Sequence, residues 1–469
     1  MNSIEPRLLD SVFGQGPGDT PVERARHSSR TFVRSIDQLA EYSTGARGRR
    51  LTAYEALEAY GFERLAEAVL EGSALLAASR DALGRVLHDR REQLALTPGR
   101  VAARAKVDVS VVEAAEQSRR VSIRECERIA RAMGLDERFI SVLPEPAGNE
   151  RVAVRLRTLG RENQGMMTHA AVSAISEAAW VAMTQIRIEE SLRLRPAPIG
   201  IEYSPNYGTP GYPAYRWGYL LAVEARRSLG LGNAPLSSLR ELAEERLGLP
   251  VIQSELGESI AGVTVEVGDR RAIVVNLSGR NRHVYVRRNT IAHELGHLLF
   301  DPPNRLNSLR VDEYEDLEAP SEMLPDAVEQ RANSFAAEFL VPQSEVVARY
   351  RSNVEDPVGT IMDEFGVSFT VARYQLWNGL DRVVPLEQLV SNRRQPPHEW
   401  EGREAFTVDY HPIRHIRPSR AGRFSALAVR AAQEGIVSWD TAAEWLETTL
   451  EEVQGSADML RDLFPAVFQ

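Results

Sequence analysis

Apolar side chains recur at three- and four-residue steps over much of this chain, the spacing of a helix with one buried face. In the first part of the chain the pattern runs from Phe32 to Ala78, and it predicts a helical extension over residues 1–78. Residues 1–30 are rich in Gly, Pro, Ser and Arg, which is typical of a disordered start.

Four short helices are predicted over residues 79–140, one after another. The first opens near Ala82, and the second begins at Thr97-Pro98, with Thr as the N-cap and Pro at the first helical position. The third spans Val109 to Gln117, and the fourth spans Ile123 to Met133 before a terminating glycine.

The apolar positions of these helices resemble the skeleton of the Xre-type helix-turn-helix domain of bacterial and phage repressors. They are Leu83, Leu87, Val101, Ala102, Ala105, Val107, Val112, Ile129, Ala130 and Leu135. The resemblance implies DNA binding, with the third helix in the major groove. The candidate contacts are one polar and five basic side chains: Ser110, Arg100, Arg104, Lys106, Arg119 and Arg120. Val109 and Glu113 occupy reader positions where such domains often carry Gln, Asn, Ser, Thr or Arg. The alternative is therefore that these helices mediate protein contacts.

A Pro- and Gly-containing linker is predicted over residues 141–165, followed by a domain over residues 166–383. This domain is expected to begin with helices at Met166–Leu194, Trp217–Leu229 and Pro235–Gly248. A short strand at Pro250–Ser254 and a hairpin of Ala261–Val267 with Arg271–Asn276 predict a small antiparallel sheet.

Residues 384–469 read as a polar linker and a helical C-terminal domain, which could form a homodimer or bind a partner helix. The expected fold class is therefore mostly α and multidomain (α+β). With 469 residues, the chain is too long for one ordinary core.

Charge and composition narrow the class of protein. The net charge of -10 argues against broad coating of nucleic acid, although it leaves room for one local basic reader. The single cysteine, Cys126, cannot form an internal disulfide, which suits a reducing compartment. Neither a signal peptide nor an apolar run long enough to span a membrane is apparent, so we expect a cytoplasmic protein without a membrane partner.

The strongest chemical signal is the stretch His293-Glu294-Leu295-Gly296-His297. Two histidines four residues apart share one face of a helix and can hold one metal ion. In this H-E-x-x-H arrangement the imidazoles bind zinc, and the glutamate acts as base on the zinc-bound water.

A second predicted helix, Ala327 to Leu340, carries Glu329 and Asn333 on one face. In zinc peptidases of the gluzincin type, a glutamate on a later helix completes the metal site, and a polar residue one turn further supports a histidine. Glu329 fits the first role and Asn333 the second, which leaves a fourth position for water.

The two segments, His293-Glu-Leu-Gly-His297 and Glu329-x-x-Ala-Asn-x-Phe-Ala-x-x-Phe-Leu-x-Pro342, resemble the ImmA/IrrE family of metallopeptidases over roughly residues 170–380. The resemblance implies a gluzincin-like zinc endopeptidase. It also implies a protein substrate, a repressor or related DNA-binding partner, cut in mobile-element control, damage response or a toxin–antitoxin circuit.

Other polar residues near these segments have plainer readings. Glu338 is expected to be a charge on the helix surface. The acidic positions are expected to form a solvated loop or a surface for a basic partner; they are Glu313, Glu315, Asp316 and Glu318. His411 and His415 repeat the four-residue spacing, but the neighbouring prolines argue against a second metal helix. His283 is expected on a surface strand.

Two other functions remain open at this point. One is a DNA-binding transcriptional regulator whose peptidase-like domain senses a ligand without proteolysis. The other is a toxin that a partner, or its own fused helical half, neutralises.

Overall fold

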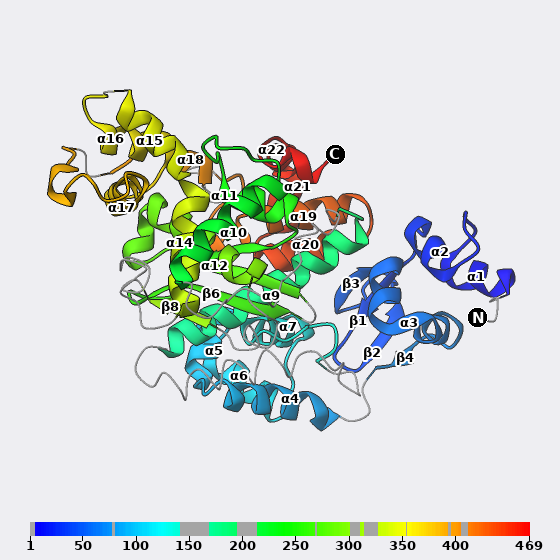
Figure 1. The fold of residues 1–469 in the computed structure, drawn as a ribbon. Helices are drawn as coiled ribbons and strands as arrows, with labels where there is room; N and C mark the ends of the chain where they lie inside the picture. The colour runs from blue at the N-terminus through cyan, green and yellow to red at the C-terminus, as the bar shows by residue number, and fades with distance from the viewer. Residues whose placement is uncertain are drawn as a thin grey trace. The chain divides into compact units, whose positions relative to one another are not determined.

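A computed structural model describes most of the chain, which divides into two compact units (Figure 1). The described residues are 5–76, 80–140, 168–194, 213–267, 270–300, 310–313, 327–352, 354–392, 395–404 and 411–469. The first unit comprises Met1–Glu162, Val172–Leu194 and Asp409–Gln469, and the second comprises Asn163–Ala171 and Arg195–Val408. The predicted linker, residues 141–165, lies outside the described residues.

The N-terminal part of the first unit contains a sheet that the sequence pattern did not reveal. Its elements are α1 (Pro6–Phe13), α2 (Pro21–His27), β1 (Thr31–Arg34), β2 (Gln38–Glu41), β3 (Arg49–Thr52), α3 (Ala53–Leu70) and β4 (Ala74–Leu75). The strands pair antiparallel in the order β3-β1-β2-β4. The expected disordered start and continuous helical pattern were therefore wrong. Strands of two to four residues are too short to show alternation, and the helical periodicity belongs to α3.

The four helices predicted over residues 79–140 are confirmed as elements. They are α4 (Arg80–Gln93), α5 (Pro98–Ala105), α6 (Val109–Glu116) and α7 (Ile123–Ala132). Thr97 caps α5 by accepting a hydrogen bond from the backbone N–H of Arg100. Ser122 and Glu125 form a capping box at the start of α7. The assignment of these four helices to an Xre-type domain remains a prediction.

The first unit contains further helices, three of which meet around two tryptophans. The further helices are α9 (His169–Ser191), α19 (Arg423–Gln433), α20 (Trp439–Leu446), α21 (Leu450–Gly455) and α22 (Ala457–Leu463). Trp180 on α9 and Trp445 on α20 are buried edge to face, with ring centroids 6.4 Å apart. Both indole N–H groups donate to the buried carboxylate of Glu137, at 2.7 and 2.8 Å. One carboxylate after α7 therefore joins α9 to α20.

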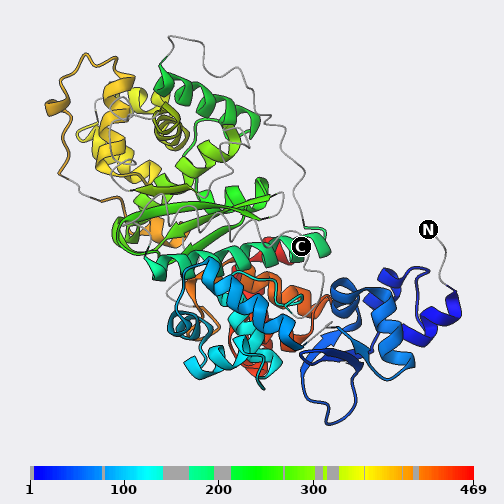
Figure 2. The same ribbon diagram turned by 90° about the horizontal axis from the view of Figure 1, so that it is seen from below.

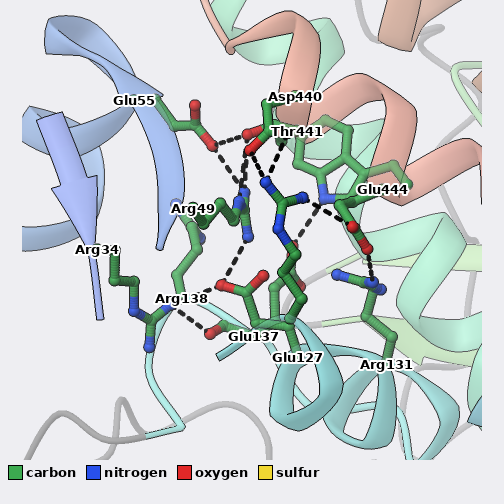
Figure 3. A network of polar contacts seen from close by, with 12 residues as sticks. Arg34, Arg49, Glu55, Glu127, Arg131, Glu137, Arg138, Asp440, Thr441 and Glu444 are labelled. Carbon is green, nitrogen blue, oxygen red and sulfur yellow. Dashed lines mark hydrogen bonds and ion pairs between the residues drawn. The ribbon is translucent and has the colours of Figure 1, made fainter. Parts of the chain in front are cut away.

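Buried charges connect the N-terminal sheet, α7 and α20 within this unit (Figure 3). Arg49 on β3 pairs with Glu55 at 2.7 Å and with Glu127 at 2.9 Å, and it donates to Thr441 at 3.0 Å. Arg34 on β1 pairs with the same Glu127 carboxylate at 3.3 Å. Because an unpaired buried charge is costly, these elements depend on one another for their stability.

The second unit contains a four-stranded sheet, drawn in shades of green in Figure 2. Its strands pair in the order β5-β7-β6-β8. The strands are β5 (Val251–Ser254), β6 (Ile260–Val267), β7 (Arg270–Asn276) and β8 (Arg310–Glu313). The predicted β6–β7 hairpin is confirmed. The sheet is mixed, however, and not antiparallel throughout, because β5 pairs parallel with β7. All four residues of β5 are buried, as is usual for strands in parallel pairing.

Helix α12 (Val284–Phe300) packs against β6 and β7 of this sheet, and the core of the unit combines residues of its helices with residues of β5 and β7. The helices are α10 (Ala214–Ser228), α11 (Leu239–Glu241) with the π turn Leu242–Arg246, α12, α14 (Ala327–Leu340), α15 (Gln343–Arg351), α16 (Pro357–Phe365), α17 (Phe369–Gly379) and α18 (Glu399–Glu404). Aromatic side chains from α12 and α14, including Phe300, Phe335 and Phe339, lie at the centre of the core. Arg288 of α12 pairs with Glu404 of α18 inside the unit.

None of the helices within the described ranges combines the length and the apolar composition needed to cross a membrane.

The paired charges of the first unit lead to a stability prediction. Changing Glu127 to Ala should lower the free energy of unfolding by about 3–5 kcal/mol, because it leaves two buried guanidinium groups without a shared carboxylate. The matched control is Glu434→Ala, which breaks an exposed pair with Arg430 and should cost less than about 1 kcal/mol. Urea unfolding of the full-length variants measures both. Equal losses for the two variants would contradict the importance of the buried pairs.

Candidate metal centre

A close helix contact brings the two candidate ligand segments together (Figure 1). Gly296 of α12 faces the ring of Phe335 on α14, and a Cβ atom at Gly296 would lie only 2.8 Å from the ring carbon Cδ1. A second helix is equally close to α14, since a Cβ atom at Gly218 of α10 would lie 2.3 Å from the carbonyl oxygen of Arg331. Both contacts exclude a side chain at the glycine, so α14 can approach its two neighbours closely.

Three candidate ligands converge at this contact. The Nε2 atoms of His293 and His297 lie 2.9 Å apart. Glu329 places Oε2 at 3.2 Å from Nε2 of His293 and Oε1 at 3.7 Å from Nε2 of His297. One ligand atom from each residue lies within 4.8 Å of the others, and all three side chains are buried. The structure therefore brings together the three residues that the spacing of the motifs singled out.

Asn333 contacts the first histidine directly. Its Oδ1 atom lies 2.7 Å from Nδ1 of His293. Because an amide oxygen can only accept, the imidazole proton belongs on Nδ1, and Nε2 presents its lone pair toward His297 and Glu329. Asn333 thus orients the imidazole and selects the tautomer that a metal ion requires.

Glu294, the candidate base, is fully buried beside the sheet. The hydroxyl of Thr264 on β6 donates to its Oε2 atom at 2.5 Å. Thr264 was not among the residues that the sequence singled out. The available signal was a polar residue within a strand of β-branched and apolar residues, which by itself does not identify its partner.

The donor set fits zinc. Two neutral imidazoles and one carboxylate are the protein ligands of several catalytic zinc sites, which keep a further position for water. Of the described residues, these three form the one cluster of at least three His, Cys, Asp or Glu side chains that could hold a metal ion.

Glu338, expected on the helix surface, is instead buried. It accepts hydrogen bonds from the backbone N–H of Gln343 at 3.1 Å and from the side chain of Gln375 at 2.5 Å. The half turn that separates it from the Glu329 face directs it toward α15 and α17, and not toward solvent. Burial raises the pKa of this carboxyl to about 8, and it does not join the candidate ligands.

Among the described residues, none of the other candidates from the sequence joins this cluster. His283 follows a short 3-10 turn, and its ring stacks on Tyr285. His411 and His415 lie in irregular chain before α19, and His411 contacts Ser425. Of the acidic positions, Glu313 belongs to β8, and Glu315, Asp316 and Glu318 are outside the described residues.

Two of the six candidate DNA contacts are ion-paired within the first unit. Arg104 lies 2.5 Å from buried Glu177 on α9, and Lys106 lies 2.6 Å from Glu447 after α20. Burial by itself raises the pKa of Glu177, but the guanidinium groups of Arg420, Arg104 and Arg417 lower it to about 2. A carboxylate with three cationic neighbours therefore holds Arg104.

The other four candidates are exposed: Arg100, Ser110, Arg119 and Arg120. DNA binding through residues 79–140 remains a prediction.

The buried carboxyl of Glu338 gives a pH-dependent prediction. Its pKa is about 8 in the folded chain against an ordinary value of 4.5, so only the unfolded chain loses this proton as pH rises between these values. Stability should therefore fall through this window, and Glu338→Gln should remove this part of the decline. We expect the melting temperature of wild type to drop between pH 5.5 and 8.5 by about 3 °C more than that of the variant.

Exposed Glu355 provides the control for this comparison, since Glu355→Gln should follow the wild-type curve. Parallel curves for wild type and Glu338→Gln would rule out a raised pKa at Glu338.

One comparison with known protein families bears on this centre. Residues 244–376 match a family profile described as the IrrE N-terminal-like domain, of the M78 peptidases. The match covers less than a third of the 469 residues and includes α12, β5–β8 and α14. A search of curated proteins finds no match. The matched segment is similar to the ImmA/IrrE family, whose members are zinc-dependent in general, and this supports a metallopeptidase at the level of the family.

Proposed function

We propose that the second unit is a zinc-dependent endopeptidase, with His293, His297 and Glu329 as metal ligands and Glu294 as the catalytic base. The observation that carries the proposal is the convergence of two imidazoles and one carboxylate, all buried, on one point between α12 and α14. The family match over residues 244–376 supports the same chemistry.

The roles of the side chains follow from their chemistry. Zinc held by His293, His297 and Glu329 would polarise the scissile carbonyl and lower the pKa of water. The Glu294 carboxylate accepts a proton from the attacking water and passes it to the leaving amine. Asn333 keeps the Nδ1 proton of His293 in place, so that Nε2 stays available as a ligand.

We also propose that the substrate is a repressor or another DNA-binding partner in a bacterial regulatory, stress-response or toxin–antitoxin circuit. The similarity of the peptidase segment to the ImmA/IrrE family supports a regulatory substrate. A second support is the resemblance of residues 79–140 to repressor domains, because peptidase and DNA reader in one chain suit control of a genetic circuit.

Replacing the base tests the assignment. Glu294→Gln should reduce cleavage by about 100- to 10,000-fold, because the amide cannot take the proton, while zinc content stays at the wild-type level. The measurement compares new protein N-termini in cells that express full-length wild type or variant, with elemental analysis of both purified proteins. Exposed Glu355→Gln serves as the matched control and should cleave normally. Identical new N-termini from wild type and Glu294→Gln would refute the proposal.

A second prediction concerns metal affinity. Asn333→Ala should weaken zinc binding by about 10- to 100-fold, because it removes the oxygen that orients His293. Competition with a zinc-chelating dye measures the affinity. Asn378→Ala, which removes an amide bonded to Tyr219 on another helix, should leave it unchanged. Equal affinities of Asn333→Ala and wild type would show that the hydrogen bond to His293 does not support the metal.

A further inference from the structure

Strand β6, which contacts the candidate base Glu294, is irregular near this contact. Between Ile260 and Gly262 the register of β6 with β8 shifts, which makes Ala261 a bulge. Bulges often lie beside active sites, because the extra residue redirects the side chains that follow it. Here Gly262 and Thr264 both come close to Glu294 on α12.

Two asparagine side chains hold the backbone of this bulge. Asn276 donates to the carbonyl oxygen of Ile260 at 2.6 Å, and Asn281 donates to that of Ala261 at 2.6 Å. Asn281 is fully buried, and its Oδ1 lies 3.3 Å from the hydroxyl of Thr290, one turn before Glu294 on α12. This hydroxyl is shared with the carbonyl oxygen of Val286, at 3.1 Å. The bulge and the helix are thereby connected through one amide, which limits their relative movement.

Gly262 leaves the space that the carboxylate occupies. A Cβ atom at this position would lie 3.0 Å from Oε1 of Glu294 and 2.7 Å from Cγ2 of Thr290. Real Cβ atoms essentially never approach a neighbour below 3.0 Å, so even alanine would require the Thr290 side chain or α12 to shift, and it would crowd the Glu294 carboxylate.

Thr264 supplies the direct contact. Its hydroxyl donates to Oε2 of Glu294 at 2.5 Å, and both residues are buried. A hydrogen bond to a charged carboxylate in a buried site is stronger than one between neutral groups. The bond also restricts rotation of the carboxylate about its last torsion, which is otherwise broad.

We infer that the bulged strand β6 positions the catalytic base, Glu294. Thr264 is a positioning residue that hydrogen-bonds to its carboxylate, and Gly262 provides room for that carboxylate. The inference rests on the proposed peptidase activity, since it assigns a function to a contact with its base. Thr264 acts through Glu294, and not on the substrate, so its loss should lower kcat and leave KM and zinc content nearly unchanged.

The test uses full-length chains with Thr264→Val, which keeps the shape of the side chain without its hydroxyl, and Thr264→Ser, which keeps the hydroxyl. With a peptide that spans the cleavage site mapped for wild type, Thr264→Val should lower kcat by about 10- to 100-fold, and Thr264→Ser should recover most of it. Thr360→Val, a threonine change on α16, controls for the substitution itself and should cleave normally.

A second readout does not depend on cleavage. In metal-free protein, Thr264→Val should lower the melting temperature when Glu294 is present and have a smaller effect in a Glu294→Ala background, because the partner is then absent. Equal shifts in the two backgrounds would overturn the contact. A change in KM alone, or failure of serine to restore kcat, would overturn the positioning role. Undiminished cleavage by Glu294→Gln would refute the proposed function itself, whatever the melting temperatures show.

Discussion

Close approach of α14 to α12 is the constraint on which the candidate centre depends. Gly296, which lies between His293 and His297 in the sequence, has no side chain. The ring of Phe335 therefore lies directly against the backbone of α12. This contact sets the distance from Glu329 to His293 at 3.2 Å. With the helices farther apart, the histidines would have no third protein ligand. The apolar packing of the two helices therefore determines whether the polar residues can act together.

Several interactions between different elements order the side chains around this contact. The candidate ligands come from α12 and α14. Asn333 fixes the tautomer of His293, and Thr264 on β6 hydrogen-bonds to the carboxylate of Glu294. Each of these interactions joins an element to one that is distant in the sequence. A site so constrained loses little entropy when it binds a metal ion or a transition state, because its side chains are already ordered.

The first unit is organised by a different physical requirement, the pairing of buried charges. Arg49, Glu127 and Thr441 come from the N-terminal sheet, α7 and α20, and they share one network (Figure 3). A second network joins Arg104 on α5 to Glu177 on α9. The helices that resemble a repressor domain are therefore integrated with α9 and the C-terminal helices.

The sequence alone determined much of the local structure. Periodicity located the long helices, and local residue preferences located the hairpin of β6 and β7 and the N-cap of α5. Motif spacing singled out His293, His297, Glu329 and Asn333. These features depend on residues near one another in the chain. The N-terminal strands were too short to show a pattern, and the burial of Glu338 depends on α15 and α17, so both were mispredicted. Only the tertiary structure decided that Thr264 meets Glu294 and that Arg104 meets Glu177. Each pair joins elements far apart in sequence, and spacing along a chain carries no information about which distant side chains will share a buried site.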